Sequence, residues 1–299
     1  MTNNHLQNCS RRQFLKTTTG IAAALTTTPL ALGDEEKTLS PPCYRYTCSS
    51  VNYASLSLEE ACRRISDLGY KAIDIWDAIP SWLKCPHLQH AAEVLKADGL
   101  TKLLEKYRLK LCGFSVYADG YAKYAELLGQ CGGGVSIQGS RAPSADSLSA
   151  DMKKFMEELK PAIELCEKHD FYLLIENHSG KTLLNKLDSL KAFVDSNTSN
   201  RIGIALAPYH VIINKESVAE AIRICGKQLR FIYVWSHEPD EKQMPGVGTI
   251  DMKDWIVALN EIGYSHAFTP FMHHEPAPDR MDELHRQSLK YLHGLEIRK

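Results

Sequence analysis

The chain has 299 residues, of which 44% are hydrophobic and 24% charged, enough to bury a core in one large domain or two small ones. This composition excludes a disordered or fibrous protein. The 35 basic residues are balanced by 36 acidic ones, so the basic surface on which nucleic-acid binding rests is missing. We expect no nucleic-acid partner and favour a small molecule.

The first 33 residues predict an export signal. Residues 10–16 read Ser-Arg-Arg-Gln-Phe-Leu-Lys, and a weakly hydrophobic run rich in Ala and Thr follows, with no acidic residue before Asp34. This pattern resembles a bacterial twin-arginine signal, and the alternative is a basic tail that happens to carry two arginines. The run is too polar and too short for a stable membrane span. We expect a signal peptide at 1–33, passage through the twin-arginine translocase, and a periplasmic or extracytoplasmic location.

Removal of this segment makes the chain more acidic. Arg11, Arg12 and Lys16 are its only formal charges, so 32 of the 35 basic residues remain against 36 acidic ones, a net charge of −4. The nine cysteines show neither a C-x-x-C pair nor zinc-knuckle spacing, and they read as buried apolar residues. Only Cys43 and Cys48 are close enough in the sequence to suggest a disulfide.

From residue 44 onward, short β-branched or aromatic runs alternate with helical patterns. Apolar residues at helical spacing predict the first helix, which Gly69 ends. Strands are expected at 44–50, 70–76, 109–117, 134–140, 171–178, 202–207, 230–235 and 267–271. Helices are expected at 58–68, 99–107, 121–128, 152–166, 187–194, 217–224, 251–262 and 282–292.

Eight strand-helix units within residues 34–299 match the (β/α)8 barrel, which typically takes about 250 residues. The stretches 67–76 and 261–271 also resemble each other, each with a helix end, Gly-Tyr and a strand. An open doubly wound sheet is the alternative, but no glycine-rich phosphate loop follows the first strand. We therefore expect an α/β fold, a single-domain TIM barrel over residues 34–299.

Polar and aromatic residues stand where the expected strands end, and the carboxyl ends of barrel strands are where such folds carry their chemistry. Together they suit a carbohydrate pocket, with donors and acceptors for hydroxyl groups and flat rings for the apolar face of a sugar. The residues at these ends are Asp74, Trp76, Gln138, Glu176, Asn177, His178, His210, Trp235, His237 and His273.

Four stretches carry a resemblance to a known family: GYKAIDIW (69–76), LLIENHSG (173–180), PYH (208–210) and PGVGTIDMKDWIVALNEIGY (245–264). They resemble the xylose isomerase-like TIM barrels, a group of sugar phosphate isomerases and epimerases and inosose dehydratases that also includes apurinic endonucleases. The resemblance implies an exported isomerase, epimerase or related lyase whose partner is a sugar or polyol. The acidic charge balance and the missing ligands for a trinuclear zinc site disfavour the nuclease.

Members of this family usually hold one divalent cation, Mn, Mg, Co or Zn, with Glu, Asp, His and Glu from the fifth to eighth strands. The resemblance aligns Glu176 with the first ligand and Ala207, Tyr233 and Phe271 with the other three. Either the cation is lost, or displaced ligands replace the usual ones. The displaced set would be Glu176, His210, His237 and His273.

Two functions follow from the resemblance. In an active enzyme, Glu176 is the base that transfers a proton, and His210 or His237 orients or polarises the substrate. The alternative is a non-catalytic carbohydrate-binding protein that keeps the pocket without the metal. In both, the residues expected to contact the substrate are Asp74, Trp76, Gln138, Asn177, His178, Trp235 and His273.

Overall fold

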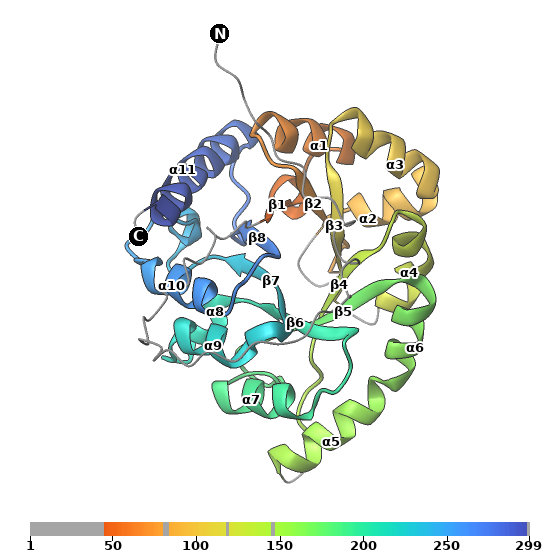
Figure 1. Cartoon of the computed structure of the whole chain (residues 1–299). Coiled ribbons are helices and arrows are strands. Elements are labelled where there is room, and N and C mark those ends of the chain that lie inside the picture. Colours follow the sequence, from red (N-terminus) through yellow and green to blue (C-terminus); the bar gives the residue numbers. More distant parts are fainter. Residues whose placement is uncertain (1–44, 80–83, 118–119, 145–146, 298–299) are drawn as a thin grey trace, which may run out of the picture. The chain divides into compact units, whose positions relative to one another are not determined.

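The computed structural model describes residues 45–79, 84–117, 120–144 and 147–297. Within these ranges, eight parallel strands form a closed barrel, each bonded to the next along the chain and β8 to β1 (Figure 1). The expected (β/α)8 fold is confirmed. The predicted signal at 1–33, Cys9 and Cys43 lie outside the described residues. The strands are β1 (Arg45–Ser49), β2 (Ala72–Trp76), β3 (Lys110–Ser115), β4 (Gly134–Gly139), β5 (Phe171–Glu176), β6 (Ile202–Leu206), β7 (Leu229–Val234) and β8 (Ala267–Pro270).

Helices lie outside the barrel and connect its strands (Figure 1). They are α1 (Leu58–Asp67), α2 (His87–His90), α3 (Lys96–Lys106), α4 (Gly120–Gln130), α5 (Leu148–Glu158), α6 (Lys160–His169), α7 (Leu187–Ser196), α8 (Pro208–Ile213), α9 (Val218–Cys225), α10 (Lys253–Glu261) and α11 (Pro278–Ile297). Short helical turns add η1 (Ser50–Tyr53), η2 (Ala91–Leu95), η3 (Gly226–Gln228) and η4 (Asp240–Gln243). In the part of the chain that the structure describes, no helix has the length and apolarity needed to cross a bilayer.

The strands are buried on both faces, and their side chains alternate between two packed layers. In β2 all five residues are buried. Ile73 and Ile75 pack outward in the layer shared with the helices, whereas Ala72 and Trp76 belong to the cluster inside the barrel. Since successive strand residues point to opposite faces, Asp74 points inward as well. This alternation decides which strand residues can reach the site.

Two of the differences from the sequence prediction follow from a proline. The helix expected over 152–166 is two helices, α5 and α6, which meet at Leu159. Pro161 has no N–H to continue the hydrogen-bond ladder, so it is tolerated only in the first turn of the second helix. Residues 208–210, which lie outside the expected helices, are the start of α8, which Pro208 begins in the same way. His210 is therefore held on a helix.

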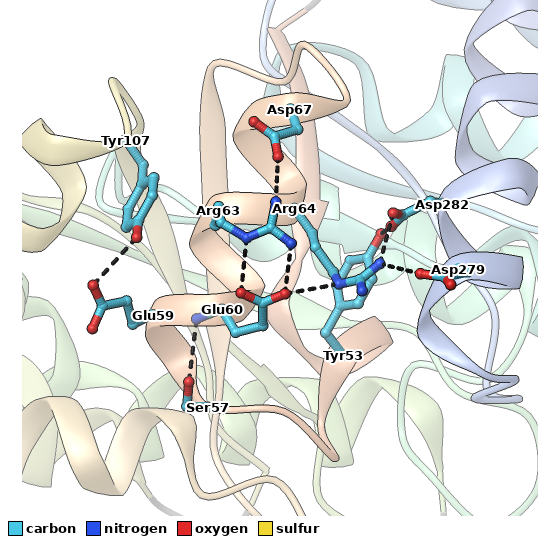
Figure 2. A network of polar contacts seen from close by, with 10 residues as sticks. All are labelled: Tyr53, Ser57, Glu59, Glu60, Arg63, Arg64, Asp67, Tyr107, Asp279 and Asp282. Carbon is cyan, nitrogen blue, oxygen red and sulfur yellow. Dashed lines mark hydrogen bonds and ion pairs between the residues drawn. The ribbon is translucent and has the colours of Figure 1, made fainter.

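Helices α1 and α11, the first and last of the barrel, are joined by a network of hydrogen bonds and ion pairs (Figure 2). Some of its side chains are largely buried and others are exposed. The Arg64 guanidinium donates to Asp282 at 2.8 Å and to Asp279 at 3.0 Å, and its Nε donates to Glu60 at 3.1 Å. Tyr53 donates to the second oxygen of Asp282 at 2.7 Å. Because Arg64 and Asp282 are only 17% and 15% exposed, solvent screens this pair less than the surface pairs nearby.

Candidate functional site

A cavity of about 240 Å³ opens at the carboxyl ends of the strands, and we call it the central cavity. Chemistry in barrels of this fold is found at this end. Three histidines, five apolar or aromatic residues and one carboxylate face it. The lining residues are Trp76, Ile79, Tyr117, Glu176, His178, His210, Tyr233, Phe271 and His273.

Glu176 is the one carboxylate among the described residues that line the central cavity. It ends β5, is 6% exposed, and stands between Gly139 of β4 and Ala205 of β6. Burial raises the pKa of Glu176 to about 8; a hydrogen bond with Tyr117 opposes the rise, and the charge of Asp74 adds to it. A carboxyl group with a pKa near neutrality can both accept and return a proton in this range.

Asp74 does not reach the cavity, contrary to the expected substrate contact. Its side chain is fully buried, and its oxygens accept hydrogen bonds from Ser49 at 2.8 Å, Ser115 at 2.8 Å and the indole N–H of Trp76 at 2.7 Å. Burial raises the pKa of Asp74 to about 7, while these three hydrogen bonds lower it. Ser115 also contacts the Tyr233 hydroxyl at 2.7 Å. Asp74 thus positions Trp76 and Tyr233, which line the cavity.

Three histidines form one side of the cavity. The ring centroids of His178 and His210 are 3.8 Å apart, and His210 Nδ1 lies 3.0 Å from the Ser179 hydroxyl. Burial lowers the pKa of His210 to about 3, and the neighbouring His178 and His273 add to the effect. His210 is therefore a neutral imidazole at physiological pH. It can exchange hydrogen bonds with a ligand but brings no positive charge.

Trp235 stands behind these histidines. It is 1% exposed, and its ring contacts His210 at 5.9 Å and His273 at 4.4 Å between centroids. Its Nε1 has no hydrogen-bond partner among the described residues, and Trp235 is not one of the residues that line the central cavity. The structure therefore gives it a packing contact with the site.

Two other expected contact residues lie beside the cavity. The Asn177 side chain donates to the carbonyl of Ala207 at 3.2 Å and accepts from the N–H of Ala207 at 2.7 Å, so it joins β5 to the end of β6. Both ends of its amide are thereby occupied. Gln138 lines a neighbouring cavity next to β4, and its buried Oε1 has no partner among the described residues.

His237 is exposed at the surface of the protein. It follows β7 on an exposed turn and does not line the central cavity. The turn is fixed by Ser236, whose N–H donates to the carbonyl of Gln243 at 2.9 Å and whose hydroxyl donates to the carbonyl of Lys242 at 3.1 Å. The chain therefore turns away before His237, and the structure gives this residue no place beside Glu176 and His210.

Tyr117 is a site residue that the sequence argument missed. It lies just beyond β3, lines the cavity, and its hydroxyl is 3.3 Å from that of Tyr233. Burial raises the pKa of Tyr117 well above its ordinary value, and the charge of Glu176 adds to the rise, so the phenol stays protonated. Its place at the end of the third expected strand was the available signal.

The sequence comparison identifies the family. Residues 62–294 match the family described as Xylose isomerase-like TIM barrel. The chain belongs to the xylose isomerase-like TIM barrel family. The family assignment therefore agrees with the closed barrel and with a site at the carboxyl ends of the strands.

Two proteins similar to this chain are named as epimerases. Fructoselysine 3-epimerase of Escherichia coli O157:H7 is 28% identical over 187 residues, which are 60% of this chain and 60% of that protein. The Shigella flexneri protein of the same name matches equally. The chain thus spans about 60% of the length of these curated relatives.

Solved xylose isomerase-like barrels share the fold. D-psicose 3-epimerase with D-fructose superposes with a TM-score of 0.66 at 15% identity, over 84% of this chain and 99% of that one. The 3-keto-D-glucoside 4-epimerase of E. coli gives the same values. At this level of identity the likeness establishes the fold alone.

The residues at the family's four metal-ligand positions do not fit a divalent cation. Glu176, Tyr233 and Phe271 line the central cavity, and Ala207 is buried in the same cluster. Burial raises the pKa of Tyr233 well above its ordinary value, so its phenol is neutral, and the Ala and Phe side chains have no donor atom. Over the described residues, no group of three or more His, Cys, Asp and Glu side chains could hold a metal ion. The displaced set expected from Glu176, His210, His237 and His273 is therefore wrong.

Proposed function

We propose that this chain binds a sugar or polyol in the central cavity and that Glu176 moves a proton on the bound molecule without a divalent cation. Glu176 carries the proposal, because it is a buried carboxyl group with a pKa of about 8 that faces a cavity suited to sugars. The epimerases named among its relatives act on sugars, which supports the same class of ligand.

The chemistry needs one base and hydrogen-bond donors. Ionised Glu176 accepts a proton from the carbon next to a sugar carbonyl; the C–H electrons form a C=C bond, and the carbonyl electrons move to oxygen. Tyr117 and neutral His210 line the cavity and are the donors proposed for the developing oxyanion, whereas the Tyr233 hydroxyl donates to Ser115, whose own hydrogen goes to Asp74. Return of the proton to the same or the adjacent carbon completes an epimerisation or an isomerisation.

A non-catalytic sugar-binding protein is the second candidate, and one observation favours it. Phe271 stands where the family has its eighth-strand glutamate, and no described Asp or Glu other than Glu176 lines the central cavity. An epimerisation that delivers the proton to the opposite face of a carbon needs a second acid, so its absence among the lining residues favours binding alone.

Deuterium exchange separates the two functions. Tag-free protein is analysed for metal and then incubated with aldoses, ketoses and inositols in D₂O, with and without a chelator. Carbon-bound deuterium that appears in the chelated wild type, and not in Glu176→Gln, supports the enzyme. Exchange that stops with the chelator contradicts a metal-free reaction, and binding without any exchange supports the second candidate. Glu157→Gln is the matched control, since Glu157 is an exposed residue paired with Lys160.

We further propose that the protein is exported by the twin-arginine route, with residues 1–33 as the signal. The Ser-Arg-Arg-Gln-Phe-Leu-Lys stretch at 10–16 supports this. Fractionation of cells that express the full chain tests it. The wild type should appear outside the cytoplasm, and replacement of Arg11 and Arg12 by lysine should retain it inside. Equal distribution of both forms would contradict the proposal.

A further inference from the structure

A second cavity of about 340 Å³ adjoins the central one, and we call it the β8-side cavity. The two share three wall residues, Trp76, Phe271 and His273, so they are neighbours across these side chains. The remaining residues of the β8-side cavity come from the segments after β1, β2 and β8. They are Val51, Ala54, Lys84, Met272, His274 and Glu275.

The shared wall is aromatic. The rings of Trp76 and Phe271 are stacked, with centroids 5.4 Å apart and planes inclined by 19°. Asp74 fixes the Trp76 ring through its indole N–H at 2.7 Å. A rigid pair of aromatic rings between two cavities offers apolar faces against which sugar rings pack.

The rest of the β8-side cavity supplies polar groups. Lys84, His274 and Glu275 are exposed at its wall and suit hydroxyl groups. Glu275 is held in place, because one of its oxygens accepts the N–H of Ser55 at 2.8 Å. An aromatic wall with a few polar groups around it is the usual make-up of a small-molecule site.

A third cavity, next to β4, is less suited to extend the site. It measures about 380 Å³ but shares only Tyr117 with the central cavity. Its charged groups are engaged with each other: Arg141 donates to Glu158 at 2.7 Å and to Asp151 at 3.0 Å. A ligand there would compete with these ion pairs. We call it the β4-side cavity.

We propose that the ligand is a disaccharide-type glycoside, with one ring in the central cavity and the second ring in the β8-side cavity. The inference rests on the proposed function, since it names the substrate class of the same site. The central cavity alone, about 240 Å³, is smaller than the roughly 300–1,000 Å³ usual for small-molecule sites. The Trp76 and Phe271 pair borders both this cavity and the β8-side cavity, whose wall carries Lys84, His274 and Glu275.

Calorimetric titration of the tag-free protein tests this assignment. The probes are D-glucose, D-galactose and D-fructose, with cellobiose, lactose and lactulose as disaccharides built from the same rings. At least one disaccharide should bind about tenfold or more tightly than its component monosaccharides, a gain of about 1.4 kcal/mol. In the double variant His274→Ala/Glu275→Gln that gain should fall to about threefold or less, while the affinity for the monosaccharide stays unchanged. Both residues are exposed, so the variant should fold.

Glu158→Gln in the β4-side cavity is the control, and it should leave both affinities unchanged. Equal binding of monosaccharides and disaccharides would overturn the glycoside assignment and leave the proposed function standing. If Glu158→Gln loses the disaccharide gain and the double variant keeps it, the second ring lies in the β4-side cavity. That result would also overturn the assignment of the second ring to the β8-side cavity. Failure of every probe to bind would count against the proposed function and the glycoside together.

Discussion

Replacement of Glu176 by glutamine should change how stability depends on pH. The carboxyl group has a pKa of about 8 in the folded protein, raised from its usual 4.5. A group with a raised pKa contributes stability that is fully present below its unfolded pKa and is lost as the pH rises through its folded pKa. The stabilising contribution of Glu176 therefore declines from about pH 4.5 upward and is gone above pH 8. Between pH 6 and 9 the linkage relation gives a loss of about 2.7 kcal/mol from this one residue.

Glu176→Gln lacks the ionisation and should not show that loss. We expect the free energy of unfolding of the wild type to fall by about 2.7 kcal/mol more than that of the variant between pH 6 and pH 9. The measurement is a urea titration at both pH values, followed by fluorescence and circular dichroism so that coincident transitions support a two-state treatment. The difference removes the contribution of Asp74, which titrates in both proteins. Glu157→Gln should behave as the wild type. Parallel losses in Glu176→Gln and the wild type would refute a protonated, buried Glu176.

Three further predictions concern stability and metal. Asn177→Ala removes two hydrogen bonds to the end of β6 and should lower the free energy of unfolding by about 2 kcal/mol in urea titrations; an unchanged midpoint would contradict the joining role. Arg64→Ala cuts the α1–α11 network and should cost about 1 kcal/mol, whereas replacement of exposed Lys191 by alanine should cost less. The triple variant Ala207→Asp/Tyr233→His/Phe271→Glu should bind about one Mn²⁺ by elemental analysis, and absence of metal from a folded variant would refute the alignment of these positions.

The fold was largely readable from the sequence because its signals are local. A strand buried on both faces is a short apolar run. Runs such as 171–176 and 202–206 are separated from each other by segments with helical spacing and by turn residues. The helix expected over 152–166 is divided at Pro161, which lies in the first turn of α6. The sequence alone does not show whether such a proline begins a second helix or is tolerated within one. The helix at Pro208 escaped notice because six residues are too few to show a period.

The site was predicted less completely, because the direction in which a side chain points and the depth at which it is buried depend on tertiary contacts. Glu176 and His210 both line the central cavity, and each stands at or just beyond the end of a recognisable strand; their catalytic roles stay predictions. Asp74 also lies near the end of a strand, yet three donors bond its carboxylate and it is not among the residues that line the central cavity. His237 stands one residue beyond Ser236, whose two hydrogen bonds turn the chain outward. No periodicity in the sequence encodes these contacts.

The network between α1 and α11 bears on how the chain folds during its synthesis. Arg64 and Asp282 are separated by 218 residues, and β1 finds its second neighbour only in β8. During synthesis the opening strand therefore keeps an unpaired edge until nearly the whole chain has left the ribosome, and such edges favour aggregation. The barrel can close only once β8 has been synthesised, and a chain that lacks β8 would leave an open sheet. Closure of the barrel and the contact between these two helices are therefore expected to form together, late in folding.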